Sequence, residues 1–246
     1  MPKFFTEKIY DDKIIIDSED VRHIKKVLRL KENEHIVVCD GKGYDYDAVI
    51  SELDEKEIIC TIAEKYPAQT EPDIRVTLYQ GLPKASKMDY IIQKNTELGI
   101  SRIVPCELNR CVVRLEDKKA TEKKTERWQK ISGEAAKQSG RGVIPKISMP
   151  MTLDAAIEKM KGEDLAIAFY ECETDRTLRK ILTEKKDVKT VGFMVGPEGG
   201  FDPAEIEKLR AAGIRTAGLG KRILRTETAG EAVLAMIMYE IGDINA

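Results

Sequence analysis

Residues 190–203 read TVGFMVGPEGGFDP, an apolar run followed by a glycine-rich turn. Asp202 is a residue type that commonly caps the start of a helix, and Pro203 suits the first helical position. The pattern therefore predicts a strand over 190–195 and a helix over 203–212. A strand that leads into a helix through a tight turn is the repeating unit of an α/β fold.

A second turn of the same kind lies further along the chain. A strand predicted over 214–219 leads into Gly220 and the basic segment 221–225, which reads KRILR. The terminal helix follows, and Thr228 with Glu231 predicts a capping box near its start. Two glycine turns that each lead into a helix indicate a ligand site, although either turn alone is equally consistent with a simple connection.

Neither turn fits the common phosphate-binding patterns. Gly220-Lys221 is followed by arginine and lacks the upstream glycine of a P-loop, and GPEGGF does not match G-x-G-x-x-G. Glu198 also places a carboxylate in the first turn. The ligand is therefore expected to be neutral or cationic rather than a polyphosphate.

The composition is that of a soluble globular protein. The chain has 246 residues, 42% of them apolar and 34% charged, which predicts one large domain or two smaller ones. The formal net charge is only -2, so a nucleic acid partner would have to be held by local basic patches.

The cysteines and histidines limit which metal sites and catalytic mechanisms are plausible. The five cysteines show no C-x-x-C spacing, which predicts reduced core thiols and neither a disulfide framework nor a zinc site. Two histidines give poor support for metal chemistry or a Ser/His/Asp hydrolase. No signal peptide or membrane-spanning run is apparent, so we expect a cytoplasmic protein with no membrane or metal partner.

The first seventy residues differ from the rest. A strand over 13–16 is followed by a short basic helix after Ser18, and three further strands are predicted over 35–40, 44–52 and 57–64. A compact antiparallel β-barrel fits this pattern.

The polar segment 67–72 holds two prolines and marks a domain boundary. Beyond it, short apolar runs alternate with helices, which predicts a mostly parallel sheet covered on both faces. Ligands bind such sheets at the carboxyl ends of the strands, where both glycine turns lie. The loop after a strand predicted over 165–170 should reach the same edge. Further strands are predicted at 74–79, 103–105 and near 147. One helix is predicted to begin near Ser86, and others to span 121–139, 152–161 and 174–184.

Five motifs in order carry a family resemblance. They are KASKMD at 84, QK-x-x-ELG at 93, EAAKQSGR at 134, GPEGGF at 196 and LGKRILRTETA at 219. Together they resemble the bacterial 16S rRNA (uracil1498-N3)-methyltransferases of the SPOUT superfamily. The MPKFF start and the helix around His23 resemble the N-terminal PUA-like domain of that family.

The resemblance implies a two-domain α/β architecture. Residues 1–70 would form a PUA-like RNA-binding β-barrel, and residues 73–246 a SPOUT-type α/β domain with a mostly parallel sheet and a deep trefoil knot. It also implies a homodimer formed through the knotted domain and its terminal helix.

The resemblance further implies S-adenosylmethionine (SAM) as cofactor. SAM is a sulfonium cation without phosphate, in agreement with the ligand class inferred from the turns. Loops at about 170–173, 196–200 and 219–225 would bind it. The expected cofactor-binding residues are Tyr170, Glu171, Gly196, Pro197, Glu198, Gly199, Gly200, Leu219, Gly220, Ile223, Leu224 and Arg225.

The implied reaction is methyl transfer to N3 of a uridine in 16S rRNA or the small ribosomal subunit. N3 is hidden in a base pair, so the base must be unpaired to react. Arg225 and Arg222 are the candidate catalytic residues that stabilise the developing uracilate anion. Their alternatives are a phosphate contact or a salt bridge, for instance to Glu227. Glu198 is either the acceptor of the N3 proton or a residue that holds the loop.

The basic helix and nearby loops are the candidate RNA contacts, although a solvated charged face is the alternative. Lys3 stands where the resemblance leads us to expect arginine. The full candidate set is Lys3, Arg22, Lys25, Lys26, Arg29, Lys84 and Arg141.

Three other functions are weighed against this one. A nicotinamide-dependent dehydrogenase would share the βα pattern but should carry G-x-G-x-x-G after its first strand. A non-catalytic RNA-binding protein would not need the two glycine turns. Methylation of another RNA nucleotide by the same SPOUT site is the third.

Overall fold

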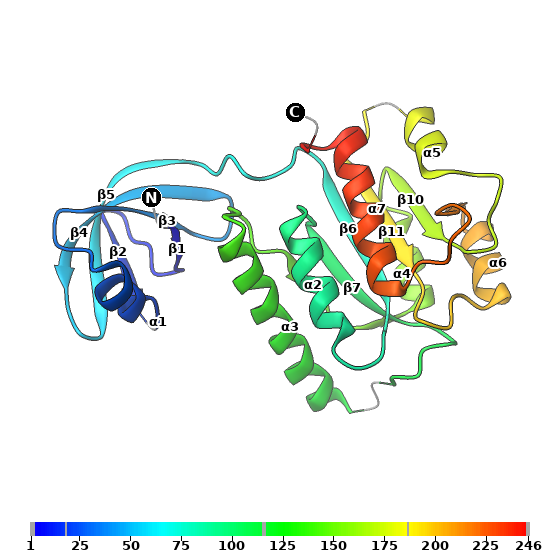
Figure 1. Ribbon diagram of the computed structural model, residues 1–246, viewed down its shortest axis with the longest axis horizontal. Coiled ribbons are helices and arrows are strands. Elements are labelled where there is room, and N and C mark those ends of the chain that lie inside the picture. The colour runs from blue at the N-terminus through cyan, green and yellow to red at the C-terminus, as the bar shows by residue number, and fades with distance from the viewer. Residues whose placement is uncertain (1–2, 18, 115–116, 186, 245–246) are drawn as a thin grey trace. The chain divides into compact units, whose positions relative to one another are not determined.

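The computed structural model describes residues 3–17, 19–114, 117–185 and 187–244, and Figure 1 shows their arrangement. The chain divides into two compact units. Unit 1 comprises Met1–Glu71 and Ala136–Ile144, and unit 2 comprises Pro72–Ala135 and Pro145–Ala246. The segment Ala136–Ile144 thus groups with the N-terminal unit, whereas the sequence prediction placed it in the second domain. Ser18, the predicted cap of the basic helix, lies outside the described residues.

Unit 1 is built on a five-stranded sheet with the strand order β1-β3-β4-β5-β2. Its pairings are antiparallel except for β1 with β3, which run parallel. β1 is a short strand that the sequence patterns did not predict. The strands are β1 (Lys3–Phe5), β2 (Lys13–Asp17), β3 (His35–Cys39), β4 (Tyr44–Leu53) and β5 (Glu57–Pro67).

Two short helical segments follow β2. They are α1 (Glu19–Arg22) and a π-helical stretch, η1 (His23–Leu28). The stretch ends at Arg29, whose φ of 55° lies in the left-handed region. Ile24 is fully buried among the inward-facing strand residues such as Ile14, Ile36 and Ile50. One apolar face of the basic helix therefore closes the core of unit 1.

Unit 2 contains a seven-stranded sheet in which every pairing between described strands is parallel. The order is β12-β10-β11-β6-β7-β8, and β9 also pairs with β7. The strands are β6 (Arg75–Gly81), β7 (Arg102–Glu107), β8 (Lys146–Ile147), β9 (Met151–Thr152), β10 (Leu165–Phe169), β11 (Thr190–Val195) and β12 (Arg215–Ala217).

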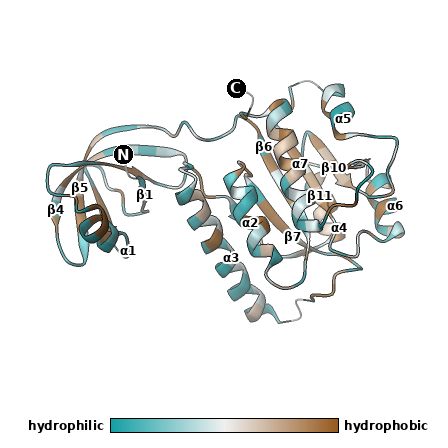
Figure 2. Ribbon diagram, in the orientation of Figure 1, coloured by the Kyte–Doolittle hydropathy of each residue, from teal (hydrophilic) through white to brown (hydrophobic). Residues whose placement is uncertain are grey.

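Helices connect these strands, as the alternating pattern predicted. α7 packs beside α2 and over β6 and β11 (Figure 1). Figure 2 shows that apolar residues concentrate on the central strands β6, β7 and β11, as expected for a parallel sheet covered by helices. The helices are α2 (Lys87–Glu97), α3 (Lys118–Gln138), α4 (Leu153–Met160), α5 (Leu178–Glu184), α6 (Pro203–Ala211) and α7 (Thr226–Ile241).

Helix starts match the sequence prediction unevenly. Asp202 and Glu205 form the predicted capping box of α6. The box predicted for Thr228 and Glu231 is wrong, because α7 begins earlier, at Thr226, and the Glu231 carboxylate accepts a hydrogen bond from the Tyr90 hydroxyl.

Two further side chains differ in their burial. Trp128 is a core anchor, since it is buried and packs within unit 2. Cys172 departs from the expected buried thiols, because it is exposed on the loop after β10, whereas the other four cysteines are buried.

Candidate functional site

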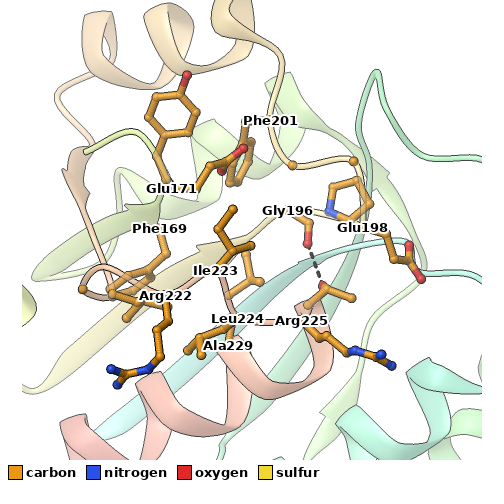
Figure 3. Close-up of a pocket in the computed structure, with 18 of the residues that line it drawn as sticks. Phe169, Glu171, Gly196, Glu198, Phe201, Arg222, Ile223, Leu224, Arg225 and Ala229 are labelled. Carbon is orange, nitrogen blue, oxygen red and sulfur yellow. Dashed lines mark hydrogen bonds between the residues drawn. The ribbon is translucent and has the colours of Figure 1, made fainter. Parts of the chain in front are cut away.

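The site lies in unit 2, where three neighbouring strands end. β12, β10 and β11 are adjacent in the sheet and run parallel, so the loops that leave their carboxyl ends meet at one edge. These loops and the start of α7 enclose a cavity of about 530 Å³ (Figure 3). This volume lies within the range of small-molecule sites in proteins.

All of the predicted cofactor-binding residues line this cavity. Three chain segments that are distant in sequence therefore converge, as the pattern of turns predicted. Arg222, predicted as a catalytic residue, also lines it, and so does Lys221 within the predicted loop 219–225. The lining residues that were not predicted for the site are Lys87, Phe169, Val195, Phe201, Thr226 and Ala229.

The GPEGG turn is held by close backbone contacts. Gly200 has φ of 68°, a left-handed conformation that favours glycine. Gly199 does not share it; instead its backbone lies against Arg110, whose Nη1 donates a hydrogen bond to the Gly199 carbonyl at 3.0 Å. Gly81 at the end of β6 leaves room for the ring of Pro197, which a Cβ there would meet at 2.7 Å. The shape of the GPEGG turn thus depends on Gly81, at the end of β6, and on Arg110, in the loop after β7.

The carboxylate of Glu198 binds the loop before α2. Glu198 Oε1 accepts the backbone N–H of Lys84 at 3.1 Å and lies 3.2 Å from the Lys87 ammonium. Burial by itself raises the pKa of this carboxyl, but hydrogen bonds from the N–H groups of Glu198 and Lys84, together with Lys87, lower the pKa below its ordinary value. These contacts favour the loop-holding role of Glu198 over the proton-acceptor role.

Lys87 also reaches the start of α7. Its ammonium lies 3.0 Å from Oε2 of Glu227, in the first turn of that helix. The salt bridge considered for the arginines through Glu227 is therefore made by Lys87 instead. Lys87 lies in the KASKMD motif, but the sequence patterns gave it no role in the site.

Arg222 and Arg225 lie on opposite sides of Ile223 in the cavity wall, and Arg225 is on the side of Glu198 (Figure 3). Within the described chain, neither guanidinium forms a hydrogen bond or ion pair. Arg225 is the N-cap residue of α7. Both cations are therefore available to an anionic group at the cavity.

A buried hydrogen-bond network fixes the floor of the cavity. Thr226 is 5% exposed, and its hydroxyl donates to the Gly196 carbonyl at 2.7 Å, drawn as a dashed line in Figure 3. The same oxygen accepts Nε2 of Gln80 at 2.8 Å, and that amide also donates to the Gly81 carbonyl. The sequence patterns did not identify Gln80 or Thr226, since each reads as an ordinary polar residue.

Three of the candidate RNA contacts are exposed in unit 1. Arg22, Lys26 and Arg29 present their side chains to solvent around the η1 helix. Lys84 is likewise exposed, in unit 2.

The other three candidates make internal contacts in unit 1. The Lys3 ammonium binds Asp45 at 2.8 Å and the carbonyl of Gly140. Lys25 donates to the carbonyl of Asp54. Arg141 is only 3% exposed and binds the carboxylate of Glu71, so its expected role in phosphate binding is not supported by its placement.

Comparison with known protein families shows to which family the chain belongs. The RNA methyltransferase domain family matches residues 70–238, and the RNA methyltransferase PUA domain family matches residues 16–63. The ribosomal RNA small subunit methyltransferase E of Bacillus subtilis is 35% identical over 229 residues, which cover 92% of this chain and 89% of that protein. The chain belongs to the ribosomal RNA small subunit methyltransferase E family.

Other members of the family agree in length and structure. The Aquifex aeolicus member is 31% identical, with 97% of this chain and 99% of that protein covered. The crystal structure of a Neisseria gonorrhoeae member, bound to S-adenosyl methionine, has a TM-score of 0.86 and 31% identity, with 99% of both chains covered. The fold of this family, an α/β unit with an N-terminal PUA-like unit, is therefore the fold described above.

Two further properties of the described part of the chain concern partners. No group of three or more His, Cys, Asp or Glu residues there is placed to hold a metal ion. None of its helices combines the length and the apolar character needed to cross a bilayer.

Proposed function

We propose that this protein transfers a methyl group from SAM to N3 of a uridine, uracil1498, in the 16S rRNA of the small ribosomal subunit. The observation that carries this proposal is the convergence of the three predicted loops on one cavity, in a chain of the family whose Neisseria gonorrhoeae member was solved with SAM. The bacterial cytoplasm, where ribosomes are made, is the expected location.

The chemistry of the cavity suits SAM. Its lining carries both carboxylates, from Glu171 and Glu198, and cations, from Lys87, Lys221, Arg222 and Arg225, and SAM likewise carries both a sulfonium cation and a carboxylate. The glycine turns and the segment 219–225 would hold the cofactor through backbone groups. SAM supplies an electrophilic methyl group; the protein residues orient the base and stabilise its charge.

Arg225 and Arg222 are the proposed catalytic residues. Removal of the N3 proton leaves a uracilate anion, and a guanidinium beside the cavity can donate hydrogen bonds to its oxygens. Arg225 is the stronger candidate, because it lies at the start of α7, on the Glu198 side of Ile223 (Figure 3). Glu198 is engaged with Lys84 and Lys87, so we assign it to holding the turn.

For RNA binding we propose Arg22, Lys26, Arg29 and Lys84, whose side chains are exposed. Cations of this kind bind phosphates and position the RNA without reading its sequence. Lys3, Lys25 and Arg141 are assigned instead to the internal structure of unit 1.

We further propose a trefoil knot and a homodimer, both implied by the family resemblance. Met236 and Tyr239 on α7 are 40% and 57% exposed, which supports a dimer contact on that helix.

Two measurements test the proposed function. Isothermal titration with SAM should show binding in the micromolar range or tighter. Small subunits from a strain lacking the protein should gain one methyl group at N3 of the target uridine, located by mass spectrometry of nuclease fragments. A methyl group on another nucleotide would change only the proposed target. SAM binding without methyl transfer would contradict the proposed methyltransferase activity.

A further inference from the structure

Lys87 joins three segments that are far apart in sequence. Its ammonium lies 3.2 Å from Glu198 in the glycine turn and 3.0 Å from Glu227 in the first turn of α7. Lys87 is itself the first residue of α2 and lines the cavity. We infer that Lys87 is a positioning residue that couples the glycine turn to the start of α7 and thereby fixes Arg225, an inference that rests on the proposed function.

The loop before α2 is shaped around this contact. Ala85 has φ of 53°, a left-handed conformation that is unfavourable for a residue with a Cβ. Such a backbone persists where its surroundings hold it in place. Here Glu198 accepts the N–H of Lys84 on one side of Ala85 and binds the ammonium of Lys87 on the other.

The ammonium of Lys87 is shared by two carboxylates. An isolated exposed ion pair contributes little to stability. Lys87, however, is only partly exposed, and two carboxylates from separate segments share it. Loss of the ammonium would leave Glu198 and Glu227 near one another without the intervening positive charge, and like charges repel.

The connection to Arg225 follows from the helix. Glu227 lies two residues after Arg225, and both belong to the start of α7. A shift of the first helical turn would move the Arg225 guanidinium relative to the cavity. Displacement of a catalytic group by about 1 Å reduces turnover by about a hundredfold.

A double-mutant cycle tests the inference. Lys87→Gln, Glu227→Gln and the double variant are compared for SAM affinity by titration and for the single-turnover methylation rate on small subunits at saturating SAM. We expect Lys87→Gln and Glu227→Gln each to slow methylation by about tenfold or more, with SAM affinity changed by less than about threefold. The double variant should be no slower than the slower single variant, because Glu227→Gln removes a contact that Lys87→Gln has already broken.

Controls separate positioning from folding. Lys94→Gln removes another lysine of α2, one that pairs with Glu97 in the same helix, and should leave the rate unchanged. Lys87→Arg keeps a cation and should retain more of the rate than Lys87→Gln. Thermal unfolding of each variant shows whether the fold is intact.

Several outcomes would overturn the inference. They are a Lys87→Gln rate within about twofold of the unchanged protein, losses that multiply in the double variant, and a loss confined to SAM affinity. A protein that neither binds SAM nor methylates RNA would instead overturn the proposed function itself.

Discussion

At the scale of single residues, the two arginines of the cavity are distinguished by their positions. Arg225, at the N-cap position of α7, lies on the side of Glu198, and Arg222 lies on the other side of Ile223 (Figure 3). Arg225→Ala should lower the single-turnover methylation rate by about a hundredfold or more, since one lost donor to a developing oxyanion costs about that much. Arg222→Ala should cost less. Single-turnover methylation assays measure both, with Arg179→Ala on α5 as a control.

Equal rates for Arg225→Ala and Arg179→Ala would contradict the charge stabilisation. A rate lost only with Arg222→Ala would exchange the roles of the two arginines.

The ionisation of Glu198 yields a second prediction. Its pKa is lowered, so the carboxylate is ionised at neutral pH and its contribution to stability is complete above its ordinary pKa. That contribution is lost only as the pH falls through the lowered pKa. Between about pH 6 and about pH 9, Glu198→Gln should therefore leave the shape of the pH–rate profile unchanged while weakening SAM binding.

Stopped or quenched methylation assays across that range, with titration of SAM at each pH, provide the measurement. Disappearance of an acidic limb in the Glu198→Gln profile would identify Glu198 as the proton acceptor after all.

At the scale of elements, the start of α7 depends on Thr226. Thr226→Val keeps the shape of the side chain but leaves the buried Gly196 carbonyl without its donor. The free energy of unfolding of unit 2 should fall by about 1–3 kcal/mol. Urea denaturation followed by the fluorescence of Trp128, the one tryptophan of the chain, reports this change.

Thr228→Val is the matched control. Thr228 is exposed in the same helix, so its substitution should change the free energy of unfolding by less than about 0.5 kcal/mol. Equal effects of the two substitutions would show that the network does not stabilise the helix start.

The basic helix of unit 1 carries a separate prediction. Arg22→Ala and Lys26→Ala each remove one exposed cation, and each should reduce the slope of log affinity against log salt by about one. Filter binding to 16S rRNA fragments at several salt concentrations measures the slope. Lys25→Ala is the comparison, because that ammonium already binds the Asp54 carbonyl and should alter the slope less.

Sequence patterns predicted the helices and strands better than the contacts between them. Alternation and turn residues located α6 and its cap, because Asp202 acts on its immediate neighbours. The capping box predicted for Thr228 and Glu231 was wrong, and Thr226, the first residue of α7, is bonded instead to Gln80, a residue far away in sequence. Local patterns do not encode such contacts. The glycine turns that line the cavity are local patterns and were predicted. The ion pair of Lys87 with Glu227 joins distant segments and was not predicted.

At the scale of the whole molecule, the proposed dimer is testable through α7. Tyr239 is 57% exposed on that helix although it is aromatic. Tyr239→Glu would place a charge in an apolar contact and should convert the dimer to a monomer. Light scattering after size-exclusion chromatography measures the mass, with Glu240→Gln as a control of the same helix. A monomer in the unsubstituted protein would contradict the proposed dimer.

The division of the chain also affects its biosynthesis. Unit 1 includes Ala136–Ile144, and Glu71 binds Arg141 and the N–H of Gly142. A ribosome must therefore extend the nascent chain far beyond the last strand of the amino-terminal sheet before that sheet receives its closing segment. The sheet of the nascent chain therefore stays incompletely covered while Pro72–Ala135 of the second unit is translated.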